Sequence, residues 1–214
     1  GINPDDHREF LNRFYTRRFA GSFATGVPFQ HNETTGDMRV SGTMASLAGL
    51  EEALEQKDPI LTDMAVRRIR MMYGVLSSIG GIPLIFLGEE WGLLNDYGYL
   101  EDSNKAEDSR WIHRPSMDWD FLEELDDQSS PHRLIFMQMQ ALFRERKSNP
   151  ALTGSQMRLL PVENPHTLSF LRWYDSNTLI VLANFSDQVQ EISLQSLRHE
   201  GFAHYLKDVF TEES

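Results

Sequence analysis

The sequence contains no cysteine, and its basic residues are few compared with its acidic ones. Without cysteine, a disulfide framework and a metal site built on thiolates are excluded. The chain has 20 lysines and arginines against 32 aspartates and glutamates, a formal net charge of −12. Because nucleic-acid-binding proteins need a basic surface to neutralise phosphates, we expect no nucleic-acid partner. A neutral substrate such as a sugar fits this charge balance, although the balance alone does not select one.

The sequence also lacks a long apolar run. No stretch approaches the ~20 residues that a membrane-spanning helix requires, so we expect no membrane partner. The first ten residues, "GINPDDHREF", match neither a signal peptide nor a transit peptide and are typical of the interior of a longer protein. Composition leaves the compartment open; a soluble cytoplasmic protein is favoured over a secreted one.

The first two thirds of the chain have the pattern of an α/β unit. A helix is predicted over residues 43–56, and a stronger one over 59–79, where Asp58 is a suitable N-cap and apolar residues recur every three or four positions. Five of the six residues at 82–87 are apolar, which predicts a buried strand. Ser130 and Pro131 then begin another helix. This alternation of helix and strand favours an α/β fold.

The pattern changes near residue 148. Four short strand-like runs follow, and a tight-turn signal, "DSN" at 175–177, separates two of them. They are "MRLLPV" (157–162), "TLSFLRWY" (167–174), "TLIVLANF" (178–185) and "VQEISL" (189–194). The sequence therefore predicts two domains, 1–147 and 148–214, the second a small antiparallel β domain.

Two glutamates, Glu89 and Glu90, directly follow the predicted strand at 82–87. Sites in parallel α/β folds form where strands end, although paired carboxylates also serve as local caps or ion-pair partners. The spacing Gly-x-Pro-x-x-x-x-Gly-x-Glu, ending at Glu90, resembles the last barrel strand of the α-amylase superfamily, glycoside hydrolase family 13. In that superfamily the glutamate supports the barrel rim, so the resemblance implies a structural role for Glu90.

Three longer stretches resemble the amylosucrases of that superfamily: "DHREFLNRFY" (6–15), "GSFATGVPFQHNETTGDMRVSGT" (21–43) and "EDSNKAEDSRWIHRP" (101–115). The resemblance implies the C-terminal part of a (β/α)8 TIM barrel in residues 1–147: the loop after strand 7, helix 7, strand 8 and helix 8. An incomplete C-terminal β-sandwich domain would follow. The chain departs from the family at Thr25, where an arginine is usual, and at Glu89, where an aspartate is usual.

The implied activity of the parent protein is retaining glucosyl transfer from sucrose to an α-1,4-glucan acceptor. Retaining enzymes need two carboxylates ~5 Å apart. In the family these, and the supporting aspartate of an Asn-His-Asp motif, lie upstream of the segment that this chain resembles. We therefore expect no catalytic residue here, no turnover by this chain alone, and a partner in the missing N-terminal part of the same barrel.

No metal or cofactor is expected. Asp6 and His7 have neither the place nor the order of the catalytic motif, and His7 and His31 lack a known ligand spacing. The acidic stretch at 101–109 lacks the glycine and glutamate positions of a calcium-binding loop.

The resemblance also implies substrate contacts. Arg110 matches an arginine that pairs with an upstream aspartate at the floor of the glucose pocket; local pairing with Asp102 or Asp108 is the alternative. For the residues named next, ordinary loop packing is the alternative to substrate binding. Arg8 and Phe10 match the fructose or acceptor side, Arg39 matches an acceptor-side arginine, Gln30 and Asn32 lie nearby in the motif, and Asp108 joins Glu90 as rim support.

Two alternatives stay open. A sucrose hydrolase of the same family would use the same residues and transfer glucose to water. A non-catalytic carbohydrate-binding or accessory remnant, or an incomplete gene model, would also explain a chain without catalytic carboxylates.

Overall fold

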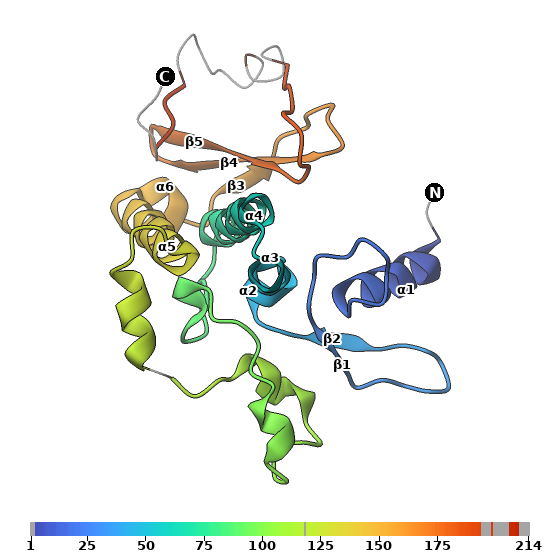
Figure 1. Ribbon diagram of the computed structural model, residues 1–214. Helices are drawn as coiled ribbons and strands as arrows, with labels where there is room; N and C mark the ends of the chain where they lie inside the picture. Colours follow the sequence, from blue (N-terminus) through green and yellow to red (C-terminus); the bar gives the residue numbers. More distant parts are fainter. Residues whose placement is uncertain (1–2, 118, 194–197, 199–205, 210–214) are drawn as a thin grey trace. The chain divides into compact units, whose positions relative to one another are not determined.

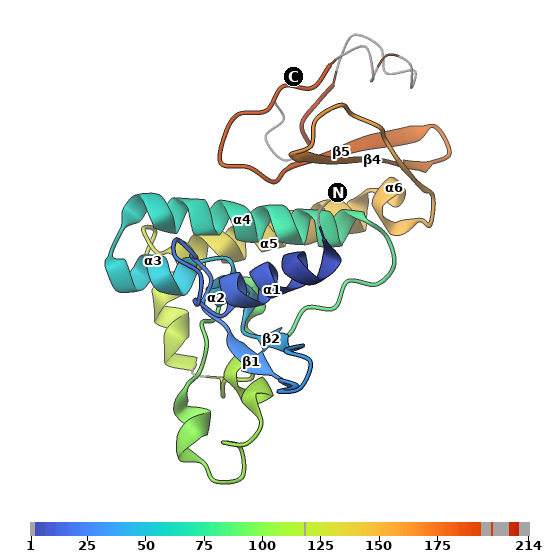
Figure 2. The ribbon, with the colours of Figure 1, turned by 90° about the vertical axis from the view of Figure 1, so that its right-hand side faces the viewer.

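The computed structural model describes residues 3–117, 119–193, 198 and 206–209. The chain divides into two compact units, one of Gly1–Ile69 with Ile85–Phe136 and the other of Arg70–Leu84 with Met137–Ser214 (Figures 1 and 2). The helices α4 (Pro59–Ser78) and α5 (Pro131–Ser148) each contribute to both. The domain boundary predicted at residues 147 and 148 stays a prediction.

The first unit holds short helices and one hairpin. Its N-terminal helix is initiated by Asn3, whose side chain accepts a hydrogen bond from Asp5 N at 3.0 Å. Neither this helix nor the hairpin was predicted from the sequence. The elements are α1 (Pro4–Tyr15), β1 (Val27–Phe29), β2 (Arg39–Ser41), α2 (Met44–Leu47), α3 (Leu50–Gln56), and the 3₁₀ turns η1 (Glu89–Trp91), η2 (Gly98–Glu101), η3 (Ser109–His113) and η4 (Trp119–Leu125).

The single helix predicted over 43–56 is two helices, α2 and α3. Gly49 separates them with a φ of 99°, a left-handed conformation that favours glycine. The chain also passes close to Phe23 at this point, because a Cβ at Gly49 would lie 3.0 Å from Phe23 Cδ2. Apolar periodicity does not detect such a break.

The predicted helix at 59–79 is confirmed as α4. Its N-cap is Asp58, whose carboxylate accepts hydrogen bonds from Ile60 N at 2.8 Å and Leu61 N at 3.1 Å. Two of the recurring apolar residues behind this prediction, Met72 and Ile79, are exposed. The buried side chains are Ala65, Ile69, Tyr73 and Ser77, at steps of four, with Val66 beside them.

The buried strand predicted at 82–87 does not form among the described residues. The segment is extended, no strand of the described residues pairs with it, and Ile82 and Leu84 are 88% and 85% exposed. Exposure alternates along it, since Pro83 and Ile85 are half-buried. A strand needs neighbouring strands to satisfy its backbone groups and cover its side chains, and the described residues supply none here.

The second unit contains an antiparallel sheet in the order β3-β4-β5, as the sequence predicted. Its strands are β3 (Met157–Leu159), β4 (Thr167–Tyr174) and β5 (Asn177–Asn184), and Thr167 pairs with Asn184. The predicted turn at 175–177 is confirmed. The predicted strand at 189–194 is not formed over 189–193, and Leu194 lies outside the described residues. A short helix, α6 (Pro150–Thr153), lies against β4 and β5 in both views (Figures 1 and 2).

One face of this sheet carries a buried arginine. Arg172, on β4, is 0% exposed, and its guanidinium donates hydrogen bonds only to backbone carbonyls among the described residues. The acceptors are Ala151 O (3.1 Å), Ile79 O (3.3 Å), Leu152 O (3.3 Å) and Gly154 O. Arg146 of α5 donates to Leu152 O as well, at 2.9 Å. The two arginines therefore fix the ends of α4 and α6 around the sheet.

Candidate functional site

The hairpin β1–β2 forms the base of the candidate site. Phe29 pairs with Arg39, so the two side chains leave neighbouring strands at the same level. The connecting turn is ordered by Asn32, whose side-chain oxygen accepts hydrogen bonds from Thr34 N at 2.9 Å and Thr35 N at 3.2 Å. Gln30 enters this turn with a φ of 51°. Asparagine suits this position because its side chain can accept hydrogen bonds from backbone amides of the turn.

The 3₁₀ turn η3 packs against both hairpin strands and places Arg110 beside them. Ser109 Oγ donates a hydrogen bond to Pro28 O at 2.9 Å. The Arg110 guanidinium carbon lies 5.2 Å from the centre of the Phe29 ring, within range of a cation–π interaction. Arg39, Arg110 and the Phe29 ring, which come from two distant sequence stretches, thus meet at one surface.

Arg110 forms a bidentate ion pair with Asp108. Its Nε lies 2.9 Å from Asp108 Oδ1 and its Nη2 lies 2.7 Å from Asp108 Oδ2. These hydrogen bonds lower the pKa of Asp108 to about 2 and raise the pKa of Arg110. Asp108 also accepts a hydrogen bond from Arg110 N and so caps η3. Of the pairings open to Arg110, the local one with Asp108 is present; pairing with an upstream aspartate stays a prediction.

Two further sequence-predicted residues lie on α1. Arg8 is within ion-pair distance of Asp5 (3.4 Å) and of Asp37 in the hairpin turn (3.8 Å). Phe10 belongs to an exposed aromatic group on and beside α1, with its ring 5.1 Å from that of Phe19 in an edge-to-face arrangement. Arg8 therefore bridges α1 and the hairpin, whereas Phe10 packs within its own aromatic group.

The glutamates after residues 82–87 both bind backbone amides. Glu90 Oε2 accepts a hydrogen bond from Gly88 N at 2.7 Å, and Glu89 Oε1 accepts one from Met44 N at 3.2 Å. Glu90 thus closes the turn that contains it. Glu89 joins η1 to the first residue of α2. These contacts hold loops together, which is the type of role that the resemblance implied for Glu90.

Asn95 is a connecting residue that sequence reasoning missed. Its side chain accepts a hydrogen bond from Thr43 N at 2.9 Å and donates one to Thr25 O at 2.7 Å. Its own backbone amide donates to Ser46 Oγ at 3.0 Å. A single asparagine after an apolar pair carries no periodic or motif signal, so only the assembled fold identifies it. The Asn95 network fixes the segment before the hairpin strand β1, α2 and the loop after η1 together.

Tyr97 extends this network to a buried acid. Its hydroxyl donates a hydrogen bond to Glu51 Oε1 at 2.7 Å, and burial together with this bond raises the pKa of Tyr97 to about 12. Glu51 is 6% exposed, and its other oxygen, Oε2, has no hydrogen-bond partner among the described residues.

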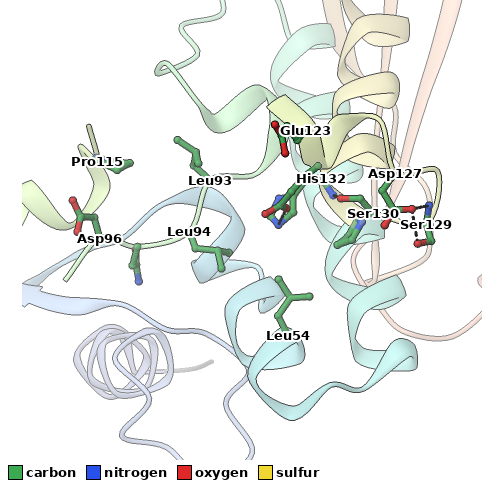
Figure 3. Close-up of a pocket in the computed structure, with 13 residues that line it drawn as sticks. Leu54, Leu93, Leu94, Asp96, Pro115, Glu123, Asp127, Ser129, Ser130 and His132 are labelled. Carbon is green, nitrogen blue, oxygen red and sulfur yellow. Dashed lines mark hydrogen bonds and ion pairs between the residues drawn. The ribbon is translucent and has the colours of Figure 1, made fainter. Parts of the chain in front are cut away.

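A cavity of about 950 Å³ lies beside this network (Figure 3), and Asn95 is one of its lining residues. His132 is buried at its edge and binds Trp91 O through Nδ1 at 3.0 Å. Because a carbonyl can only accept, His132 Nδ1 carries the proton. The lining residues are Leu54, Leu93, Leu94, Asn95, Asp96, Pro115, Glu123, Glu124, Asp127, Ser129, Ser130, Pro131 and His132.

Two negative findings limit the chemistry of the described part of the chain. It contains no group of three or more histidines, aspartates and glutamates that could hold a metal ion. It also contains no helix long and apolar enough to cross a membrane. The candidate site around the hairpin offers arginines, amides and an aromatic face, which are groups that bind and orient a ligand.

Two comparisons with known proteins bear on the family. Residues 157–213 match the family model of the maltogenic amylase C-terminal domain. This range includes all three strands of the sheet β3-β4-β5. Over 156 residues the chain is 22% identical to a trehalose synthase from Thermus thermophilus. Together the two matches are consistent with a relation to the α-amylase family. The helices and small antiparallel sheets of the structure are consistent with the C-terminal part of such a protein.

The match to trehalose synthase covers 63% of this chain but only 16% of the relative. The chain thus spans a small part of that protein's length, and the activity of a whole enzyme does not follow from the match. The comparisons therefore support a relation to the α-amylase family and no particular activity.

Proposed function

We propose that this chain is the C-terminal part of an amylosucrase-type enzyme, which cleaves sucrose and transfers glucose to an α-1,4-glucan acceptor. The observation that supports the proposal best is the meeting of Arg39, Arg110 and Phe29 at one surface. Planar guanidinium groups can bridge adjacent sugar hydroxyls, and an aromatic face can cover the apolar side of a sugar ring. The cluster therefore has the chemistry of a saccharide subsite.

The segment at 82–87 fits the barrel part of the proposal. From Ile82 to Phe86 its apolar side chains alternate between exposed and half-buried, the period of a strand. A TIM-barrel strand is apolar on both faces and is covered by the barrel interior and by helices. We infer that residues 82–87 are strand 8, and that upstream strands of the same protein pair with it.

Arg110 would close the floor of the glucose pocket. In the complete enzyme an upstream aspartate at the floor of the glucose pocket would bind its guanidinium. Asp108 already occupies Nε and Nη2, but a guanidinium has five N–H donors and can bridge two carboxylates. Asp108 would then hold Arg110 in position for the pocket.

The test is sucrose consumption and product distribution in the enzyme that contains this chain. Arg110→Ala should lower kcat/KM on sucrose by at least roughly a hundredfold, because the glucose pocket loses the side chain that positions the glucosyl ring. Arg110→Lys should rescue little, since an ammonium lacks the planar fork. The matched variant Arg39→Ala should leave sucrose cleavage comparatively intact and change the split between transfer and hydrolysis.

Normal sucrose cleavage by Arg110→Ala would refute the pocket-floor role and leave only the local pair with Asp108. Predominant hydrolysis by the unmodified enzyme would favour the sucrose hydrolase. Genomic sequence directly 5′ of the Gly1 codon separates the enzyme from a non-catalytic remnant. An in-frame Asn-His-Asp motif there supports the enzyme. A start codon at that point supports a non-catalytic carbohydrate-binding remnant.

A further inference from the structure

A side chain closes the base of the hairpin β1–β2. The backbone pairing of the two strands stops at Val27 and Ser41 (Figure 1), and in the same register Thr25 and Thr43 would face each other two positions further on. The Asn95 side chain accepts a hydrogen bond from Thr43 N at 2.9 Å and donates one to Thr25 O at 2.7 Å. In a hydrogen-bonded antiparallel pair these two backbone groups would bind each other directly. The carboxamide therefore extends the ladder in place of a peptide group.

The groups that Asn95 binds have little access to water. Thr25 and Thr43 are 8% and 1% exposed. A buried backbone group that loses its partner is not compensated by solvent, so each of these bonds matters to the hairpin. Asn95 is itself held from the other side, because its backbone amide donates to the hydroxyl of the buried Ser46 at 3.0 Å. One residue thus fixes both ends of the hairpin to the loop after η1.

The hairpin depends on such contacts, since two strands alone are marginally stable in water. The turn η3 binds β1 through the hydroxyl of Ser109 at 2.9 Å. Arg8 of α1 reaches the hairpin turn at 3.8 Å in an exposed ion pair, a type of contact that contributes little. Of these three contacts, that of Asn95 binds the ends of both strands at once. We therefore expect the position of β2, and of the Arg39 that it carries, to depend on Asn95.

We propose that Asn95 is a positioning residue that sets how often glucose is transferred to a glucan rather than to water. This inference rests on the proposed function, in which Arg39 lies on the acceptor side. Arg110 has a support of its own, because Asp108 binds its Nε at 2.9 Å and its Nη2 at 2.7 Å. A shift of β2 moves Arg39 more than Arg110. Asn95 thus acts on the choice of acceptor more than on sucrose cleavage.

The test is Asn95→Asp in the enzyme that contains this chain. The replacement has the same shape and still accepts from Thr43 N, but it presents an oxygen to Thr25 O where the N–H donor stood. The ratio of transfer to hydrolysis should fall at least about threefold and KM for the glucan should rise, with kcat for sucrose consumption within about twofold of the unmodified enzyme. Amide hydrogen exchange of β1 and β2 should become at least about tenfold faster.

Asn184→Asp is the matched control. The Asn184 side chain accepts a hydrogen bond from Ser186 N at 2.9 Å and donates one to Gln188 O at 2.7 Å. The substitution therefore makes the same exchange of a donor for an oxygen, in a loop of the second unit. It should keep the product ratio, the KM for glucan and the hairpin exchange of the unmodified enzyme. If it shifts the product ratio as Asn95→Asp does, the effect is not specific to the hairpin and the proposal fails.

The two readouts separate the possible failures. Unchanged exchange of β1 and β2 in Asn95→Asp would refute the link between Asn95 and the hairpin. Faster exchange with an unchanged product ratio, or an equal loss of cleavage and transfer, would refute the role in acceptor choice. An unmodified enzyme that does not consume sucrose would instead refute the proposed function. Because exchange needs no substrate, it would still decide whether Asn95 positions the hairpin.

Discussion

Arg172 provides the sharpest prediction about stability. Arg172→Met removes a guanidinium that donates to four backbone carbonyls, two of them in part-buried bonds (Ile79 O and Gly154 O); Leu152 O keeps a second donor in Arg146. The other three lose the Arg172 bond. A carbonyl left without its partner costs about 1 kcal/mol at the low end, so the sheet should be destabilised by about 3 kcal/mol. Burial of the guanidinium charge is costly, and it lowers the pKa of Arg172. Methionine removes that cost, which opposes the lost hydrogen bonds and keeps the destabilisation near the low end.

The assay is amide hydrogen exchange of β4 and β5 in the purified protein. A loss of about 3 kcal/mol should speed their exchange by roughly 150-fold, since 1.36 kcal/mol is a factor of ten. The control is Arg144→Met on α5, because Arg144 is exposed, donates one bond to Gln140 O, and has a helix propensity close to that of methionine. Unchanged β4 and β5 exchange in Arg172→Met would show that burial relief outweighs the lost bonds.

Two further predictions follow from local geometry. Gly80→Ala should destabilise the protein by about 1–3 kcal/mol and so speed amide exchange of β4. The reasons are that Gly80 has a φ of 110° and that a Cβ there would lie 2.8 Å from Arg172 Nη1. Exchange like that of the unmodified protein would contradict the close approach. Tyr97 should ionise only near pH 12, since burial and the hydrogen bond to Glu51 raise its pKa from 10.0 to about 12. A raised pKa in the folded state means that its contribution to stability is complete below pH 10 and is lost as pH rises to 12. Ultraviolet titration of phenolate against a Tyr97→Phe variant checks this, and a Tyr97 transition near pH 10 would refute it.

Elements with a local cause were predictable. Asp58 and Pro59 mark the start of α4, and Ser130 and Pro131 mark the start of α5, because capping and proline act on the next few residues. The predicted turn at 175–177 likewise joins β4 and β5. The helix break at Gly49 was missed because it leaves the apolar period intact. Helix α1 was missed although Asn3 and Pro4 begin it in the same way as Asp58 and Pro59 begin α4.

The candidate site was predictable only in part. The motif resemblance named Arg39 and Arg110, but the pairing of Phe29 with Arg39 and the packing of η3 on the hairpin are products of chain folding. Asn95 and Arg172 carried no sequence signal, because a polar residue that binds distant backbone groups looks like any other polar residue. Their partners are up to 70 and 93 residues away.

By itself, the sequence determined local elements such as α4, α5 and the β4–β5 hairpin, and the absence of thiol chemistry. The tertiary structure decided which of these elements find partners. Residues 82–87 have the composition of a buried strand, yet Ile82 and Leu84 stay exposed because a strand is completed by hydrogen bonds and side chains from its neighbours. Likewise, Arg172 is buried only because the ends of α4 and α6 bring their carbonyls to one point of the sheet. Such contacts depend on residues distant in sequence, and no local pattern encodes them.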